Sequence, residues 1–350
     1  MKFNIFIIGL SILPMLSCNQ VKEEKYKAAD KSTTLFNYAP STVSSEAIAI
    51  INAFTSAESK PPMPAADAVE QWQMIQQQME TASNEQMQAI IENLGLNVSA
   101  LELGGTPVLD IKPKDWKDNG KVLVYTHGGA YVLFSAMSTI PISGSVAQAT
   151  GFRIISIDYT LAPHAKWNQI SDEIVAVFKE LLKQGYSMND IGLFGDSAGG
   201  GLASTTVLRL RNEGLGMPAA VVLFSPMADL TCPGESYQTL KATEPMYDYE
   251  LHMEPSFAAY ADSLDQKNPY VSSVYGDFTK GYSPTLIQGG TKELLLSSFV
   301  RLYQALDIAG VNVSLDIYEG MPHVFQRYPI PESKIALNKV NDFFREHLGS

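Results

Sequence analysis

The sequence has little of several features that would point to a function class at once. Only two cysteines occur in 350 residues, Cys18 and Cys232, and two are too few for a disulfide framework. Basic residues number 25 and acidic residues 37, which gives a formal net charge of −12. Because nucleic-acid binding needs lysine and arginine gathered on one face, and no basic cluster occurs, we expect no nucleic-acid partner.

The chain also lacks internal repeats, low-complexity tracts and any cluster of histidine and cysteine that would hold zinc. No glycine-rich loop precedes a Lys-Ser or Lys-Thr pair, so a phosphate-cradling motif is missing as well. We therefore predict neither a metal nor a cofactor. What is present is a large share of hydrophobic residues, 45%, against 18% charged, and this composition predicts a folded protein with a large core.

The first 17 residues differ from the rest of the chain. They contain Lys2, then an apolar run that ends at Leu16, then the small residue Ser17. A short basic start, an apolar run and a small residue before a break are typical of an export signal, and the run is too short for a stable membrane span. The alternative interpretation is an ordinary apolar N-terminal helix.

The segment around Cys18 resembles the end of a bacterial lipoprotein signal, in which the chain is cleaved before the cysteine and a lipid is attached to it. The resemblance implies a signal peptide over residues 1–17, lipidation of Cys18, and an exported protein in the cell envelope, either periplasmic or at the cell surface. Residues 18–43 begin with polar and charged side chains, which suit a solvated tether. We expect contact with a membrane only through the lipid.

Helical spacing of apolar residues runs from Ser44 to Gly95. Ser44 can cap a first helix, a second helix begins at about Ala66 after a proline-rich break, and a third passes through Met87 and stops at Gly95. We predict that residues 44–96 form N-terminal cap helices.

After these helices the period changes to that of strands. Two runs flank a Gly-Gly pair, which suggests an antiparallel pair of strands, and further short apolar runs alternate with helical stretches. Such alternation predicts an α/β fold in which parallel strands are buried on both faces of a doubly wound sheet. The predicted strands are Val98–Leu103, Pro107–Lys112, Lys121–Thr126, Phe152–Asp158, Ile191–Phe194, Ala220–Ser225, Thr285–Gln288 and Val313–Tyr318. The predicted helices are Asp172–Lys183, Gly200–Glu213 and Glu332–Leu348.

A stretch rich in tyrosine, proline and methionine, from Cys232 to Tyr282, interrupts the alternation. We interpret residues 232–282, approximately, as a cap insertion into a catalytic domain that spans residues 97–350. Together with the N-terminal helices it would cover the carboxyl edge of the sheet, where open α/β sheets bind their ligands.

Ser197 is the central residue of Gly195-Asp196-Ser197-Ala198-Gly199, which lies between a predicted strand and a predicted helix. Strand, sharp turn and helix are the geometry of a nucleophile elbow, in which the serine hydroxyl is exposed on a strained turn. The glycines two residues before and after the serine avoid collisions across that turn. The alternative is a glycine-rich turn that packs a helix on a strand.

A second motif, His127-Gly-Gly-Ala-Tyr, directly follows an earlier predicted strand. Its position is that of an oxyanion loop, so we predict that the N–H groups of Gly128 and Gly129 face a substrate oxygen, with the N–H of Ala198 as a third donor. His127 is expected to be structural, because it precedes the serine in the chain. Tyr131 is a candidate for the acyl pocket, although a core position suits it equally well.

These motifs together resemble the hormone-sensitive-lipase-like family of bacterial esterases, also called bacterial family IV. The family implies an α/β-hydrolase fold with a mostly parallel eight-stranded sheet flanked by helices, a helical cap, and short-acyl carboxylesterase activity without a cofactor. Ala130 replaces the third glycine that is usual in the oxyanion motif. The matching segments occur in family order over roughly residues 97–348 and begin at His127, Asp158, Gly195, Ser225 and Gly320.

A serine hydroxyl needs a general base, and the base needs an orienting acid. His323 follows the last predicted strand and comes after the serine, which is the position of the base in the order serine, acid, histidine. Glu293 follows the preceding strand, where the resemblance implies an aspartate or glutamate. Asp229 remains the alternative acid.

The sequence thus predicts a serine carboxylesterase that acts through an acyl-enzyme on short-acyl esters or lactones, with Ser197, His323 and Glu293 as its triad. Three alternatives stay open: an amide or formamide hydrolase, an esterase of acetylated carbohydrates, and a non-catalytic ligand-binding pseudoenzyme. The oligomeric state is not predicted.

Overall fold

The chain divides into two units, Met1–Thr33 and Thr34–Ser350. A computed structural model describes residues 35–349, apart from the side chains of residues 82–85. The predictions of a signal peptide over residues 1–17 and of lipidation at Cys18 therefore lie outside the described residues. No helix among residues 35–349 is both long enough and apolar enough to cross a membrane.

A single sheet of eight strands forms the centre of the described part, in the order β1-β2-β4-β3-β5-β6-β7-β8. The first two strands pair antiparallel with each other, β2 pairs antiparallel with β4, and all other neighbours are parallel. The predicted fold class is confirmed. The strands are β1 (Leu96–Leu103), β2 (Thr106–Pro113), β3 (Val122–Thr126), β4 (Arg153–Ile157), β5 (Ile191–Asp196), β6 (Ala220–Phe224), β7 (Thr285–Gly290) and β8 (Val313–Tyr318).

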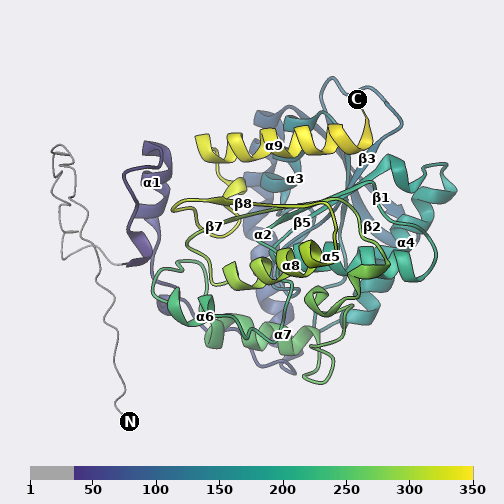
Figure 1. The fold of residues 1–350 in the computed structure, drawn as a ribbon. Helices are drawn as coiled ribbons and strands as arrows, with labels where there is room; N and C mark the ends of the chain where they lie inside the picture. The colour runs from purple at the N-terminus through teal and green to yellow at the C-terminus, as the bar shows by residue number, and fades with distance from the viewer. Residues whose placement is uncertain (1–34, 350) are drawn as a thin grey trace, which may run out of the picture. The chain divides into compact units, whose positions relative to one another are not determined.

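Helices cover both faces of the sheet (Figure 1). On one face α9 packs against β5, β6 and β7, and α3 packs against α9. On the other face α4 contacts β1 and β2, α5 contacts β3, β5 and β6, and α8 contacts β7 and β8. Every residue of the central strands β3, β5 and β6 is buried, because both of their faces are covered by apolar side chains. The helices are α3 (Ile140–Thr150), α4 (Trp167–Lys183), α5 (Ser197–Asn212), α8 (Leu296–Ile308) and α9 (Pro331–Leu348).

The N-terminal helices depart from the prediction in number. As expected, Ser44 caps α1 (Ser45–Ala53), since its hydroxyl accepts a hydrogen bond from the N–H of Ala47 at 3.1 Å. The predicted second and third helices are one continuous helix, α2 (Val69–Leu94). No glycine or proline interrupts this span, so the i→i+4 ladder continues until Gly95, whose φ of 61° ends the helix.

The cap consists of loops and short helices from two distant parts of the chain. The link between α1 and α2 is joined to the insertion by a hydrogen bond from the N–H of Met63 to the carbonyl oxygen of Leu251, at 2.8 Å. Of the predicted N-terminal cap, this link lines the pocket, whereas α1 packs on α9 and α2 packs on α3 and β1. The short helices of the insertion are α6 (Ser236–Thr239), η4 (Tyr249–Met253), α7 (Glu254–Tyr260), η5 (Ser273–Tyr275) and η6 (Phe278–Lys280).

The end of the predicted tether is part of the folded unit. Leu35–Asn37 forms a short helix, η1, and the ammonium of Lys292 donates to the carbonyl oxygens of Leu35 and Tyr38 at 3.2 and 2.5 Å. A tether as far as residue 43 is therefore too long. The remaining short helices are η2 (Ala57–Ser59), η3 (Met188–Asp190) and η7 (Phe325–Arg327).

Candidate active site

Ser197 lies on a strained turn between β5 and α5. The strand ends at Asp196, the helix begins at Ser197, and the φ of Ser197 is 54°, a value that residues other than glycine rarely adopt. A Cβ at Gly195 would collide with the carbonyl oxygen of Gly199, and a Cβ at Gly199 would collide with that of Thr126. The two glycines therefore allow the turn that exposes the serine hydroxyl, as a nucleophile elbow requires.

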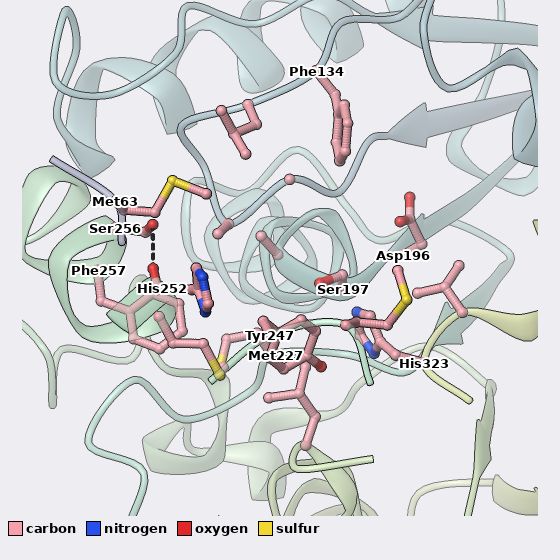
Figure 2. A pocket seen from close by; sticks show the side chains of 18 of the residues that line it. Met63, Phe134, Asp196, Ser197, Met227, Tyr247, His252, Ser256, Phe257 and His323 are labelled. Carbon is pink, nitrogen blue, oxygen red and sulfur yellow. Dashed lines mark hydrogen bonds between the residues drawn. The ribbon is translucent and has the colours of Figure 1, made fainter. Parts of the chain in front are cut away.

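His323 and Glu293 form a buried pair beside this turn. Nδ1 of His323 lies 2.7 Å from Oε2 of Glu293, and these residues are 6% and 0% exposed. Because the carboxylate accepts, Nδ1 carries the proton and Nε2 is left as the basic nitrogen. Ser197 and His323 line the same pocket, and Figure 2 shows the imidazole turned toward the serine.

The other oxygen of Glu293 is held by two donors. Oε1 accepts from the hydroxyl of Ser225 at 2.8 Å and from the N–H of Gly290 at 2.5 Å. The same Ser225 hydroxyl accepts from the N–H of Val324 at 3.2 Å, so one side chain links the loop of the acid to the loop of the base. No role for Ser225 was predicted from the sequence, although its place directly after β6 sets it at the carboxyl edge of the sheet.

Asp229, the alternative acid, is occupied elsewhere. Its carboxylate is fully buried, pairs with Arg301, and accepts from both the N–H and the hydroxyl of Thr231 at 2.9 and 2.6 Å. The carboxylate that contacts His323 is that of Glu293.

The oxyanion loop differs from the prediction at Gly128. Its N–H donates to Oδ1 of Asp196 at 2.9 Å, so this group is not free to face a substrate, and the prediction of Gly128 as a donor is wrong. The hydroxyl of Tyr125 donates to the same oxygen at 2.5 Å, and burial raises the pKa of Asp196. Asp196 therefore fixes the start of the loop, a role that its place beside the serine had suggested from the sequence.

The next two residues of the loop, Gly129 and Ala130, line the pocket with Ala198. Their φ values are 111° and 53°, which turn the backbone sharply after Gly128. Within residues 35–349 no acceptor is bonded to the N–H of either residue. Ala198 occupies the first turn of α5, where N–H groups lack intrahelical partners and the helix dipole favours negative charge.

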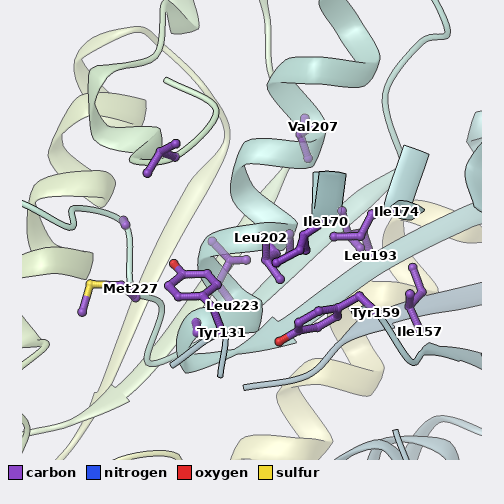
Figure 3. Close-up of a cluster of buried hydrophobic side chains, with 14 of the residues drawn as sticks. Tyr131, Ile157, Tyr159, Ile170, Ile174, Leu193, Leu202, Val207, Leu223 and Met227 are labelled. Carbon is purple, nitrogen blue, oxygen red and sulfur yellow. The ribbon is translucent and has the colours of Figure 1, made fainter. Parts of the chain in front are cut away.

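Tyr131 belongs to the core and not to the pocket, so its prediction as a pocket residue is wrong. The side chain is 1% exposed and its ring stacks on Tyr260 with centroids 3.7 Å apart. Figure 3 shows Tyr131 among buried apolar side chains that include Leu202 and Leu223. His127 is structural, as expected: its Nδ1 lies 2.7 Å from the carbonyl oxygen of Gly128 and its ring stacks on Tyr159.

Comparison with known proteins agrees with this geometry. A family model described as alpha/beta hydrolase fold matches residues 123–327, which is more than half of the chain. The chain belongs to the α/β-hydrolase family.

Individual relatives of this hydrolase are esterases or carry related names. It is 34% identical to an acetyl-hydrolase from Streptomyces hygroscopicus over 67% of its own length and 78% of that protein. The crystal structure of esterase E25 has a TM-score of 0.82 at 28% identity, with 93% of this chain and 99% of that chain covered. An esterase from the bacterial hormone-sensitive lipase family has a TM-score of 0.70 at 33% identity, with 73% and 86% covered. These findings support the family resemblance, and the chain is a serine carboxylesterase.

The pocket of the hydrolase has a volume of about 370 Å³ and mostly apolar walls. Four methionines contribute to these walls, and they come from the link, from the loop after β6 and from the cap insertion. Unbranched thioether side chains adapt their shape readily to apolar ligands. The methionines are Met63, Met227, Met246 and Met253.

Two polar side chains of the cap wall, His252 and Ser256, are already bonded, whereas the buried hydroxyl of Tyr247 has no hydrogen-bond partner among the described residues. Nδ1 of His252 accepts from the N–H of Asp248 at 2.8 Å, so Nε2 carries the proton and donates to the carbonyl oxygen of Pro61 at 3.2 Å. Burial lowers the pKa of His252, which favours this neutral form. The hydroxyl of Ser256 donates to the carbonyl oxygen of His252 (Figure 2). The wall thus presents mainly apolar atoms to a ligand.

Proposed function

We propose that the protein hydrolyses short-acyl carboxylic esters, including lactones, through an acyl-enzyme formed on Ser197. His323 serves as the general base and then as the general acid, and Glu293 fixes the imidazole and stabilises its protonated form. The N–H groups of Gly129, Ala130 and Ala198 hold the oxyanion, with Ala130 in the place first predicted for Gly128.

The proposed reaction uses these groups in three steps. The hydroxyl oxygen of Ser197 attacks the ester carbonyl while Nε2 of His323 takes its proton. The tetrahedral intermediate then collapses, the C–O bond to the alcohol breaks, and His323 returns the proton to the leaving oxygen. His323 then takes a proton from a water molecule, which attacks the acyl-enzyme. The bond between the acyl group and Ser197 breaks, the carboxylic acid leaves, and the proton returns to the serine oxygen.

The observation that carries this proposal is the buried 2.7 Å hydrogen bond between His323 and Glu293 beside a serine on a strained turn. A ligand-binding protein without catalysis has no need of a base held in one tautomer by a buried carboxylate. The pseudoenzyme alternative is therefore the weaker one.

The pocket favours an apolar acyl group over a carbohydrate. Sugar hydroxyls buried without hydrogen-bond partners would each cost free energy. The polar groups of His252 and Ser256 are already bonded within the protein, so the cap insertion offers a sugar mainly the one hydroxyl of Tyr247. The relative from Streptomyces hygroscopicus is an acetyl-hydrolase by name, and a small acyl group of that kind fits a volume of about 370 Å³.

Turnover of p-nitrophenyl acetate and butyrate by Ser197→Ala tests the proposal. Loss of the nucleophile should lower kcat by about 10⁴-fold or more, because only the oxyanion donors and binding remain. Ser145→Ala is the matched control, since the Ser145 hydroxyl donates only within α3, to the carbonyl oxygen of Pro141. Turnover by Ser197→Ala within tenfold of the unaltered protein would refute the assignment.

We also propose that the protein is exported and anchored in the cell envelope through a lipid on Cys18. The support is the order of a basic residue, an apolar run and a small residue before this cysteine. A palmitate analogue should label the full chain in cells, and Cys18→Ser should remove the label. Labelling that survives in Cys18→Ser would contradict the anchor.

A further inference from the structure

Glu244 is a buried carboxylate in the cap insertion, and the reaction proposed above gives it no task. The residue is 2% exposed, and an ionised group in such a place costs free energy unless hydrogen bonds compensate it. Its Oε1 accepts from the N–H of Met246 at 2.7 Å, and its Oε2 accepts from the N–H of Leu294 at 3.3 Å. Leu294 directly follows the proposed triad acid, so this carboxylate joins the cap to the loop of the acid.

Charged groups from three parts of the chain surround this carboxylate. The ammonium of Lys60, in the link, donates to the carbonyl oxygens of Pro245 and Met246 at 3.1 and 2.8 Å. The ammonium of Lys292, beside Glu293, holds the N-terminal segment through the carbonyl oxygens described above. The titratable groups that act on Glu244 electrostatically are Lys60, Lys292, Glu293, His323, Tyr247 and Tyr328.

The turn that Glu244 holds carries Tyr247 to the proposed base. The ring of Tyr247 meets the imidazole of His323 edge to face, with centroids 5.0 Å apart and planes at 87°. Both side chains line the pocket (Figure 2). Displacement of the Met246 N–H would therefore move a ring that limits the orientation of His323.

We propose that Glu244 is a positioning residue for the reaction. In its ionised form it accepts hydrogen bonds from the N–H groups of both Met246 and Leu294. These bonds keep Tyr247 against His323, and they keep Glu293 in place. The inference rests on the proposed function, since it assigns Glu244 a part in the geometry of that triad. A carboxylate can accept both bonds, whereas a protonated carboxyl keeps one good acceptor oxygen.

Burial raises the pKa of Glu244 to about 7. The carboxyl therefore changes from protonated to ionised between pH 5.5 and pH 8.5, and the number of hydrogen bonds that it accepts well changes with it. A pKa raised on folding adds stability that is fully present below the usual pKa of the carboxyl and is lost as the pH rises through 7. Ionisation at pH 8 therefore improves positioning while it lowers the free energy of unfolding. Glu244→Gln resembles the protonated carboxyl, and we expect it to fold at pH 8 at least as well as the unaltered protein.

The test is the ratio of kcat/KM for p-nitrophenyl butyrate between the unaltered protein and Glu244→Gln, measured from pH 5.5 to pH 8.5. We expect a ratio of about 10- to 100-fold at pH 8.5, the value of one charged hydrogen bond, and a ratio near one at pH 5.5. Glu250→Gln is the matched control in the same insertion, because Glu250 is exposed and pairs with Lys241. Its ratio should stay near one at every pH.

A ratio for Glu244→Gln that does not change with pH would contradict the inference, since a purely structural loss acts equally at all pH values. A Glu244→Gln chain that unfolds at pH 8 would also contradict it, because the neutral form is required to be folded. Labelling with a fluorophosphonate separates this inference from the proposed function. If Ser197 of the unaltered protein is not labelled, the proposed function fails; if it is labelled while the ratio stays constant, only the role of Glu244 fails.

Discussion

The floor and the cap wall of the pocket are built in different ways. The floor consists of residues at the carboxyl ends of neighbouring strands, and continuous polar contacts run from Ser225 through Glu293 to His323. The cap wall comes from the link around Met63 and from the insertion around Leu251, two parts that lie 188 residues apart in the chain. Its lining of the pocket is mainly apolar and includes methionines.

This difference separates two tasks. Proton transfer needs atoms fixed within a few tenths of an ångström, which strand ends and buried hydrogen bonds provide. Selection of an acyl chain needs a boundary of the right size, which adaptable side chains provide. Substitutions in the floor should therefore lower kcat for every ester, whereas substitutions in the cap wall should change the preference among chain lengths.

The largest effect on kcat should distinguish the two buried carboxylates of the floor, Glu293 and Asp229. Glu293→Gln should lower kcat by about 10³- to 10⁴-fold, because the amide no longer holds the productive tautomer of His323. Asp229→Asn should lower the melting temperature, since it leaves Arg301 without its buried partner, but should change kcat by less than about tenfold. Steady-state kinetics with p-nitrophenyl butyrate and thermal unfolding measure both. Equal kcat losses in the two variants would show that the His323–Glu293 contact is not special.

The oxyanion loop should give the next largest effect. A Cβ at Gly129 would collide with the carbonyl oxygen of Leu133, so Gly129→Ala should displace the loop and lower kcat by about 10²- to 10³-fold. Gly105→Ala is the matched control, because Gly105 also has a positive φ, 87°, but its Cβ would meet nothing within 4 Å. It should cost about 1 kcal/mol of stability and leave kcat unchanged. Similar kcat values for the two variants would exclude this loop as a donor.

The smallest effect should come from the cap wall and should concern selectivity. Met253→Trp fills part of the pocket, so kcat/KM for p-nitrophenyl octanoate should fall about tenfold more than that for the acetate, which corresponds to 1–3 kcal/mol of lost fit. Met74→Trp is the control, because Met74 is 56% exposed on α2 and does not line the pocket. Equal losses of kcat/KM for the two esters in Met253→Trp would show that the cap wall does not select the acyl chain.

The same division explains what could be predicted from the sequence. The eight strands were placed to within two residues at each end, because their apolar runs reflect burial on both faces. Ser197 and His323 could be predicted because an elbow and a strand end are local features with fixed chain order, whereas Glu293 was predicted from the family resemblance. The structure brings these three together at one edge of the sheet, and their chemical roles stay predictions.

Other features depend on contacts that no local pattern encodes. Gly128 and Gly129 are adjacent glycines that the sequence does not distinguish. Only the contact with Asp196 shows that the N–H of Gly128 already donates a hydrogen bond. Tyr131 could be assigned to core or pocket only from its stacking on Tyr260. Glu244 resembles any other glutamate of the insertion until its burial is known. Each of these positions is decided by a residue distant in the chain.

The central claim is that His323 activates Ser197 as a nucleophile, and reaction with a fluorophosphonate tests it most directly. Intact-protein mass spectrometry of the unaltered protein should show one adduct, and peptide mapping should place it on Ser197. His323→Ala should react far more slowly under the same conditions. An adduct on another residue, or ester hydrolysis that continues after Ser197 is fully modified, would contradict the account.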